Sequence, residues 1–254
     1  MARQPVFWHQ TAALERETEL IVRLTKAAIC MRRHPAVWNW ASGVGNRKPG
    51  KDNSTKLKAS RSLSLLRCMG NVVERLVAEI LPYVAQRRGL LSDGQFGRSK
   101  GQSSIDAVAI ILKRAHAAWT NGHITGVLLM DIMAAFPSVA KGRLVNLMKV
   151  REMDGDLIRW MKSFDSGHPV EIKIEGNAME RHPVEAGVPQ GFPVSPILFA
   201  IYTSGLIKWV EQYVPAKGQA SVDDPSLVVP GSTVNLVVMI AERCAPKCVE
   251  LASR

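Results

Sequence analysis

The stretch Gly126-Val127-Leu128-Leu129-Met130-Asp131 decides how this chain is organised. A short apolar run that ends on a carboxylate predicts a buried strand leading to a polar site. Far downstream, Ser221-Val222-Asp223-Asp224 places two adjacent aspartates in what we expect to be a tight turn between strands. Carboxylates that converge from two strand ends can hold a pair of magnesium ions, because magnesium prefers hard oxygen ligands. Two such ions stabilise both oxygens of an in-line phosphoryl transfer.

The charge balance agrees with a partner that carries phosphates. The chain has 33 Lys and Arg against 22 Asp and Glu, a formal net charge of +11, and a sequence pI near 9.8. An excess of this size favours a polyanion, although a merely soluble basic protein has the same signature. The length of 254 residues allows one large domain or two small ones, and the hydrophobic content of 46% excludes a wholly disordered chain. Acidic residues at the centre of a basic chain are typical of a nucleic-acid polymerase.

The cysteines and the apolar segments indicate a protein that is neither secreted nor inserted in a membrane. Cys244 and Cys248 are four residues apart, but no histidine lies nearby to complete a zinc site, so we expect ordinary thiols in a reducing compartment. The first ten residues lack the apolar core of a secretory signal. The longest apolar stretch, residues 196–207, is too short to span a bilayer.

Apolar periodicity and turn residues predict an α+β fold. We expect helices at about residues 11–33, 69–87, 103–120, 141–150, 157–164, 197–213 and 235–253. We expect strands at residues 61–66, 126–131 and 170–175, and loops at residues 43–58, 90–102 and 185–196. Helices mixed with a few separated strands favour a sheet with helices on one face.

Five sequence blocks in a fixed order carry a family resemblance. They are Arg61-Ser62-Leu63-Ser64-Leu65-Leu66 with Gly70-Asn71-Val72-Val73-Glu74-Arg75, then Gln95-Phe96-Gly97, Asp131-Ile132-Met133-Ala134-Ala135-Phe136, Pro189-Gln190-Gly191-Phe192-Pro193, and Ser221-Val222-Asp223-Asp224. From about residue 34 to the C-terminus the chain resembles the reverse transcriptase of non-LTR (LINE-like) retrotransposons. A lone Asp-Asp pair would carry almost no weight, but five ordered blocks exclude chance.

The resemblance implies roles for individual residues. Asp131 and Asp223 would hold two magnesium ions, with Asp224 as the third carboxylate and the backbone carbonyl of Ile132 as a further ligand. For the incoming nucleotide, the resemblance implies that the Phe136 ring forms a wall that excludes a 2′-hydroxyl. It implies that Arg61 and Lys58 contact the triphosphate, and that Gln190 and Gly191 belong to a loop that lies close to the nucleotide and the template. Template contacts would come from Gln95, Arg98 and Lys100. Two alternatives stay open: Phe136 as a core aromatic, and residues 95–100 as a plain solvated loop.

Several residues depart from the family pattern. Met133 stands where the family has lysine, Ser221 where it has an aromatic residue, and Phe192 where it has serine. We expect Ser221 to leave a void or admit water, and Phe192 to crowd its loop. Pro225 directly follows Asp224 and removes a ladder N–H, so we expect it to distort the hairpin that presents the aspartates.

The resemblance also implies the architecture and the partners. It predicts a right-hand fold with a small antiparallel sheet packed on helices: an N-terminal helical connector (residues 1–42), fingers (43–125) and a partial palm (126–254), with the thumb absent. An RNA template, a DNA primer and deoxynucleoside triphosphates would be its partners, and the nucleus its location. Two hypotheses follow: RNA-directed DNA polymerisation, or a truncated, degenerate and inactive remnant with at most non-specific nucleic-acid binding. For the isolated polypeptide we favour the remnant.

Overall fold

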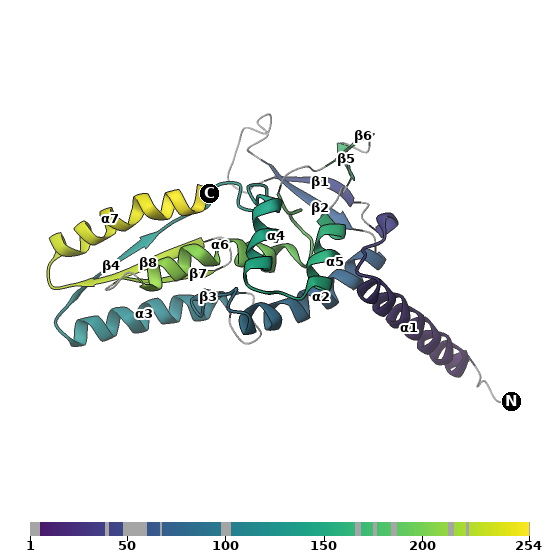
Figure 1. The fold of residues 1–254 in the computed structure, drawn as a ribbon, viewed down its shortest axis with the longest axis horizontal. Helices are drawn as coiled ribbons and strands as arrows, with labels where there is room; N and C mark the ends of the chain where they lie inside the picture. The colour runs from purple at the N-terminus through teal and green to yellow at the C-terminus, as the bar shows by residue number, and fades with distance from the viewer. Residues whose placement is uncertain are drawn as a thin grey trace. The chain divides into compact units, whose positions relative to one another are not determined.

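The chain folds into two compact units that alternate along the sequence (Figure 1). The computed structural model describes residues 6–38, 41–47, 60–66, 68–97, 103–165, 169–174, 177–183, 187–212, 216–221 and 224–253. Unit 1 comprises Met1–Leu76 and Asp154–Glu185, and unit 2 comprises Val77–Met153 and Ala186–Arg254. These boundaries differ from the predicted connector, fingers and palm, which remain a prediction.

Unit 1 holds a mixed sheet and helical segments. Its elements are α1 (Val6–Cys30), η1 (Ala36–Trp38), β1 (Ala41–Arg47), β2 (Ser60–Leu66), the first part of α2 (Cys68–Arg87), α5 (Gly155–Asp165), β5 (Pro169–Ile174) and β6 (Asn177–Pro183). The strand order is β2-β1-β5-β6, with β1 and β5 parallel and the other pairs antiparallel. Residues 43–47, predicted as loop, therefore form a strand; pairing on both sides of β1 outweighs the low strand propensity of its glycines. Residues 48–58 of that predicted loop lie outside the described residues.

An aromatic cluster around His34 ties the segment after α1 to α5. The His34 ring makes edge contacts with Trp38, Trp160 and Phe164 at centroid separations of 5.8, 5.6 and 5.6 Å. The His34 backbone N–H donates to Ser163 Oγ at 3.0 Å, and the Ser163 hydroxyl donates back to the His34 carbonyl at 3.3 Å. These contacts anchor His34 against α5 within unit 1.

Unit 2 is a sheet covered by helices on both faces. Its elements are the rest of α2, β3 (Gln95–Phe96), α3 (Ser104–Thr120), β4 (Ile124–Leu129), α4 (Lys141–Val150), α6 (Ser195–Gln212), β7 (Lys217–Ser221), β8 (Asp224–Gly231) and α7 (Val234–Ser253). The strand order is β3-β7-β8-β4, antiparallel except between β3 and β7. The predicted helices are confirmed with shifts of a few residues at their ends. The α3 helix begins with a capping box of Ser103 with Asp106, at the predicted helix start.

Two neighbouring residues of β7 show that the helices lie on opposite faces of this sheet. The Gln219 side chain donates to the Ala107 carbonyl of α3 at 2.7 Å. Gly218 lies against Val210 of α6, and successive strand residues point to opposite faces. The α7 helix packs with α6 in one apolar cluster that includes the buried thiols Cys244 and Cys248. The prediction of helices on one face only was therefore wrong, because periodicity does not reveal on which side of a sheet a helix crosses.

The strand that precedes Asp131 is an edge strand. It spans Ile124–Leu129 and pairs with β8 at the end of the strand order. Val127 is 43% exposed and Leu129 is 73% exposed, so the prediction of a buried strand was wrong. Leu128 packs on the cluster of α6 and α7, whereas Val127 and Leu129 point to the other face. An apolar run does not by itself distinguish a central strand from an edge strand.

None of the described helices combines the length and the apolar composition needed to cross a membrane.

Candidate active site

The register of β4 and β8 brings Asp131 and Asp224 to the same end of the unit 2 sheet. Leu129 pairs with Ser226, and the Met130 N–H donates to the Pro225 carbonyl at 3.0 Å. Continued by one more pair, this register sets Asp131 opposite Asp224, and cross-strand neighbours point to the same face. Both aspartates are exposed. Asp224 begins β8 and pairs with Ser221 at the end of β7, while Asp223 lies outside the described residues.

Pro225 fits this hairpin without breaking it. It pairs with Ala220 in a ladder that continues to Asp224, so the described strands of the hairpin do not show the predicted distortion; the turn residues 222–223 lie outside the described residues. In an antiparallel ladder the N–H and C=O of one residue point to the same neighbouring strand. Because the Pro225 carbonyl accepts from Met130, the missing N–H also faces Met130, one residue beyond the end of β4. The proline therefore removes only one backbone hydrogen bond, at the end of the β4–β8 ladder.

The turn that follows Asp131 places Phe136 at the edge of the core. Ala134 has a φ of 53°, a left-handed conformation that is uncommon for alanine. Its carbonyl accepts from the Ser138 N–H at 2.9 Å, and Ser138 Oγ donates to the Ala135 carbonyl at 2.8 Å. The half-buried Phe136 ring lies 5.4 Å from the Phe199 ring of α6. Phe136 thus has a core contact and an exposed part, which is compatible with both of its predicted roles.

The segment 187–196 is bonded to this turn. The Gly187 N–H donates to the Val139 carbonyl at 3.1 Å, and the Val188 N–H donates to the Phe136 carbonyl at 2.9 Å. Gly187 has a φ of 78°, and a Cβ there would lie 2.5 Å from Pro137 Cα, so only glycine fits. The half-buried Gln190 and the exposed Gly191 follow three and four residues later. These hydrogen bonds therefore join the segment that holds Gln190 and Gly191 to the turn that follows Asp131 and contains Phe136.

The other departures from the family pattern are also accommodated. Phe192 is one of the largest fully buried side chains of the described residues, so its bulk fills the core under the loop. Ser221 is half-buried, and its hydroxyl donates to Ser104 Oγ at the start of α3 at 2.9 Å. Met133 is exposed. These substitutions therefore leave the hairpin and the loop in regular hydrogen-bonded arrangements.

Gln95 has an internal role in the structure. Its side chain is buried, accepts from the Ser92 N–H at 3.1 Å and donates to the Ala200 carbonyl of α6 at 2.6 Å. A template contact would require these bonds to break. Of the other predicted contacts, Arg98, Lys100 and Lys58 lie outside the described residues. Arg61 belongs to β2 of unit 1 and is described by its backbone alone.

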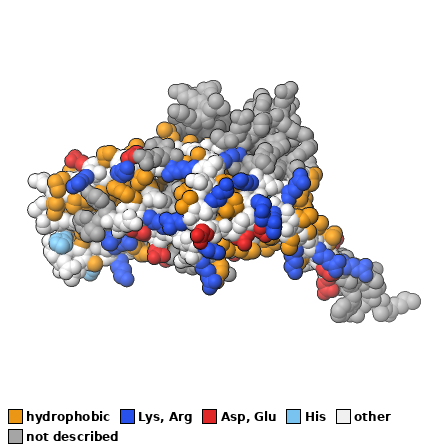
Figure 2. All heavy atoms as spheres, viewed as in Figure 1, with side chains coloured by type: hydrophobic (Ala, Val, Ile, Leu, Met, Phe, Trp, Pro, Cys, Tyr) orange, Lys and Arg blue, Asp and Glu red, His pale blue; other side chains and the backbone are white. Residues whose placement is uncertain are grey.

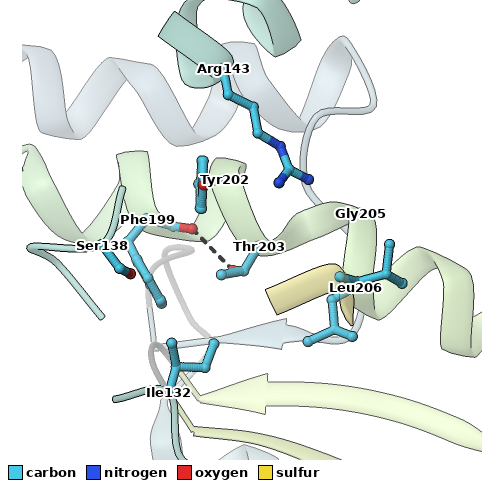
Figure 3. Close-up of a pocket in the computed structure, with 9 residues that line it drawn as sticks. Ile132, Ser138, Arg143, Phe199, Tyr202, Thr203, Gly205 and Leu206 are labelled. Atoms are coloured by element: carbon cyan, nitrogen blue, oxygen red, sulfur yellow. Dashed lines mark hydrogen bonds between the residues drawn. The ribbon is translucent and has the colours of Figure 1, made fainter. Parts of the chain in front are cut away.

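A small cavity lies beside the residue that follows Asp131 (Figure 3). It has a volume of about 70 Å³, and Ile132, Ser138 and Arg143 are among its lining residues. Arg143 extends from α4 toward α6, with its guanidinium carbon 5.1 Å from the centre of the Tyr202 ring. Its Nη1 atom is buried without a hydrogen-bond partner among the described residues. The half-buried Ile132 side chain thus lines this cavity directly after Asp131. No motif marked Arg143 in the sequence.

The donor chemistry at the strand ends fits a hard cation. Asp131 and Asp224 supply exposed carboxylates at adjacent backbone positions, and carboxylate oxygen is the ligand that magnesium prefers. Within the described residues no group of three metal-binding side chains occurs, and Asp223, the third carboxylate of the predicted set, is outside them.

The chain is similar to known RNA-directed DNA polymerases. The model of the family "Reverse transcriptase (RNA-dependent DNA polymerase)" matches residues 47–241. A probable RNA-directed DNA polymerase from transposon BS of Drosophila melanogaster is 26% identical over 68% of this chain and 19% of its own length. The probable polymerase from the X-element of the same species is 26% identical over 75% of this chain and 21% of its own length. The polymerase from its mobile element jockey is 27% identical over 68% and 19%. The chain thus spans about a fifth of the length of these relatives.

Solved structures show the same fold. Apo telomerase from Candida tropicalis matches 82% of this chain and 46% of its own, with a TM-score of 0.55 and 11% identity. Telomerase from Candida albicans, in complex with a fragment of telomeric RNA, matches 90% and 43%, with a TM-score of 0.53 and 16% identity. Reverse transcriptases bind an RNA template with a primer and use divalent metal ions. The predicted right-hand fold and the resemblance to LINE-like elements are confirmed, and this chain belongs to the reverse transcriptase family of RNA-dependent DNA polymerases.

Proposed function

We propose that this chain extends a DNA primer along an RNA template, as the reverse transcriptase part of a non-LTR retrotransposon polymerase. The observation that carries the proposal is the register of β4 and β8, which, continued by one pair, supports Asp131 and Asp224 as neighbouring ligands at one sheet end. The β7–β8 ladder that continues through Pro225 supports it as well, because it pairs Asp224 with Ser221 and so fixes the backbone that presents Asp224. An inactive remnant is the outcome that the experiment has to exclude.

The proposed metal ligands are Asp131, Asp223 and Asp224, with the Ile132 backbone carbonyl as a further oxygen. Two magnesium ions, when bound, stabilise the charge on the attacking and leaving oxygens of the transfer. The chain itself positions the strand ends: the Pro225 carbonyl accepts a hydrogen bond from the Met130 N–H, and the Ile132 side chain lines the cavity of Figure 3. Rigid strand ends matter because this chemistry depends on positioning and charge stabilisation.

Five residues are the proposed nucleotide contacts. The exposed part of the Phe136 ring excludes a 2′-hydroxyl, the group that distinguishes ribonucleotides from deoxyribonucleotides. Gln190 and Gly191 approach the base pair from a loop whose backbone is bonded to the Phe136 carbonyl. Arg61 and Lys58 bind the triphosphate, where a guanidinium gives two parallel hydrogen bonds; these two assignments rest on the resemblance alone. Nuclear location is part of the same proposal.

Primer extension on an RNA template, with magnesium and deoxynucleotides, tests the proposal. We expect extension by the wild-type chain and its loss, by about a hundredfold or more, in Asp131→Asn and Asp224→Asn, because each removes a charged ligand. Asp93→Asn is the matched control, since Asp93 is an exposed aspartate of unit 2 that is not among the proposed metal ligands. Extension that persists in Asp131→Asn would refute the ligand assignment. No extension by a folded wild-type chain would leave the inactive remnant as the conclusion.

A further inference from the structure

A larger groove lies in unit 2, away from the aspartates. It has a volume of about 280 Å³ and runs between the last turns of α3 and the strands β7 and β8. Its lining residues are Arg114, Ala117, Ala118, Asn121, His123, Lys217, Val228 and Pro230. In Figure 2, histidine side chains lie at the end of the molecule where α3 leads into β4. The groove therefore combines apolar side chains, which make up most of its lining, with cationic and amide side chains.

Arg114 is held in a fixed orientation at this groove. Its Nη1 donates to Gln219 Oε1 at 3.2 Å, and Gln219 Nε2 donates in turn to the Ala107 carbonyl at 2.7 Å. Gln219 is 1% exposed, so both ends of its amide are fixed in the interior. Burial lowers the pKa of the Arg114 guanidinium, but an arginine stays charged at neutral pH. A guanidinium has five N–H donors in a rigid fork, and the bond to Gln219 uses one of them.

The charge around the groove favours an anion. No acidic residue lines it, and no salt bridge within the described ranges involves Arg114 or Lys217. Glu211 is the acidic side chain that acts on Arg114 electrostatically, and it accepts a hydrogen bond from Ser92.

The C-terminus of α3 opposes an anion, because helix C-termini carry partial negative charge. Two of its carbonyls are covered, however. Asn121 Nδ2 donates to the Ala117 carbonyl, and the His123 N–H donates to the Ala118 carbonyl. The positive side chains therefore dominate the rim of the groove.

The groove is separate from the proposed catalytic centre. Its β8 residues, Val228 and Pro230, are four and six positions after Asp224, and a strand rises about 3.3 Å per residue. Lys217, at the far end of β7, pairs with Val228. The groove thus lies about 13–20 Å along the sheet from the carboxylates, which is too far for the reacting nucleotide.

We propose that this groove binds the sugar–phosphate backbone of a single nucleic-acid strand, through Arg114 and Lys217, independently of sequence. The proposal rests on the proposed function for the nature of the ligand. The apolar side chains that line the groove include no Phe, Tyr or Trp ring on which a base could stack, so the proposed contacts are to phosphates. The fixed guanidinium suits two phosphate oxygens, and Lys217 adds a second, mobile charge.

The salt dependence of binding tests the groove. We would titrate wild-type protein and the double variant Arg114→Gln/Lys217→Gln with a labelled oligouridine of about twenty nucleotides, without magnesium, at several salt concentrations. Each lost phosphate contact lowers the slope of log K against log salt by about 0.7 for single strands. We therefore expect the double variant to lower the slope by about 1.4. The exposed Ala117→Glu, which places a carboxylate in the groove without touching the Gln219 bonds, should lower the affinity in the same way.

The matched control is Lys113→Gln/Lys149→Gln, which removes the same charge from exposed positions outside the groove lining. A slope that falls equally in the control and in the groove variant would overturn the proposal, because only net charge would then matter. Acetylation of lysines gives a second readout on the unaltered protein: the oligonucleotide should protect Lys217 but not Lys113. A polyglutamate peptide that protects Lys217 as well as RNA does would overturn the proposal in favour of a site for acidic protein.

Failure of the groove and failure of the polymerase are distinguishable. Asp131→Asn removes extension if the polymerase proposal holds and leaves the groove contacts intact. If the groove proposal alone is wrong, extension still depends on Asp131, while the double variant binds with the wild-type slope.

Discussion

At the scale of single residues, His34 is a buried side chain without polar compensation. It is 2% exposed, and neither ring nitrogen has a hydrogen-bond partner among the described residues. Burial lowers its pKa to about 4 from the ordinary 6.5. Between pH 6.5 and about pH 4, the His34 side chain is therefore protonated in the unfolded chain but neutral in the folded chain. The free energy of unfolding is unaffected by His34 titration above pH 6.5, and it falls by up to about 3 kcal/mol as the pH drops through this window.

We predict that His34→Phe removes most of this acid sensitivity. Phenylalanine keeps the edge contacts with Trp38, Trp160 and Phe164 and has no nitrogen to desolvate, and replacing an unpaired buried polar group by an apolar one of similar shape is neutral or stabilising. Urea unfolding followed by tryptophan fluorescence, at about pH 7.5 and about pH 4.5, measures the difference. The exposed His116→Gln is the control. Equal acid destabilisation of wild type and His34→Phe would contradict the prediction.

At the scale of elements, the turn after Asp131 and the segment 187–196 act as one piece. Two backbone hydrogen bonds, from Gly187 and Val188, join them, and Gly187 leaves no space for a side chain. The pattern Pro-Gln-Gly identified this segment in the sequence, but its bonds to the turn required the tertiary structure. The distance along the chain between Phe136 and Val188 shows why: no local propensity connects residues that far apart.

Gly187→Ala and Gly142→Ala form a matched pair that tests this coupling. At Gly187 the positive φ and the contact with Pro137 should cost about 1–3 kcal/mol or more and reduce extension sharply. Gly142 lies exposed within α4, and an added Cβ there would meet open space, so alanine should stabilise by up to about 1 kcal/mol and leave extension unchanged. Thermal unfolding and primer extension read out both effects. Wild-type behaviour of Gly187→Ala would show that the two segments are not coupled.

At the scale of the whole molecule, the net charge of +11 favours binding of the nucleic acid that the proposed function requires, and the aspartates oppose it locally. We predict that Asp223→Asn leaves metal-free binding of a single-stranded oligonucleotide unchanged or slightly tighter, because one repelling charge is removed. Fluorescence anisotropy at low salt measures this. A collapse of binding in a folded Asp223→Asn protein would mean that Asp223 supports the nucleic-acid site itself.

Local sequence patterns predicted many of the helices and the family of this protein. Apolar periodicity predicted α2, α3, α4 and α7 to within a few residues, because amphipathic spacing and caps such as Ser103 act over a few positions. The ordered motifs identified the family and the residues of the candidate site. Sequence patterns wrongly predicted that β4 is buried, and they predicted that Pro225 distorts a hairpin whose described strands pair regularly. They also predicted Gln95 as a template contact or part of a solvated loop, whereas its side chain is buried.

What tertiary structure alone decided is which distant segments meet. The edge position of β4, the second helical layer over the sheet, the bonds of Gln95 to Ser92 and α6, and the groove at Arg114 all depend on contacts beyond the reach of local patterns. Periodicity records which side of an element is apolar but not what covers it. The sequence by itself therefore determined the family, most of the elements and the aspartates, and long-range packing determined how Asp131, Asp224 and the loop after Gly187 come together.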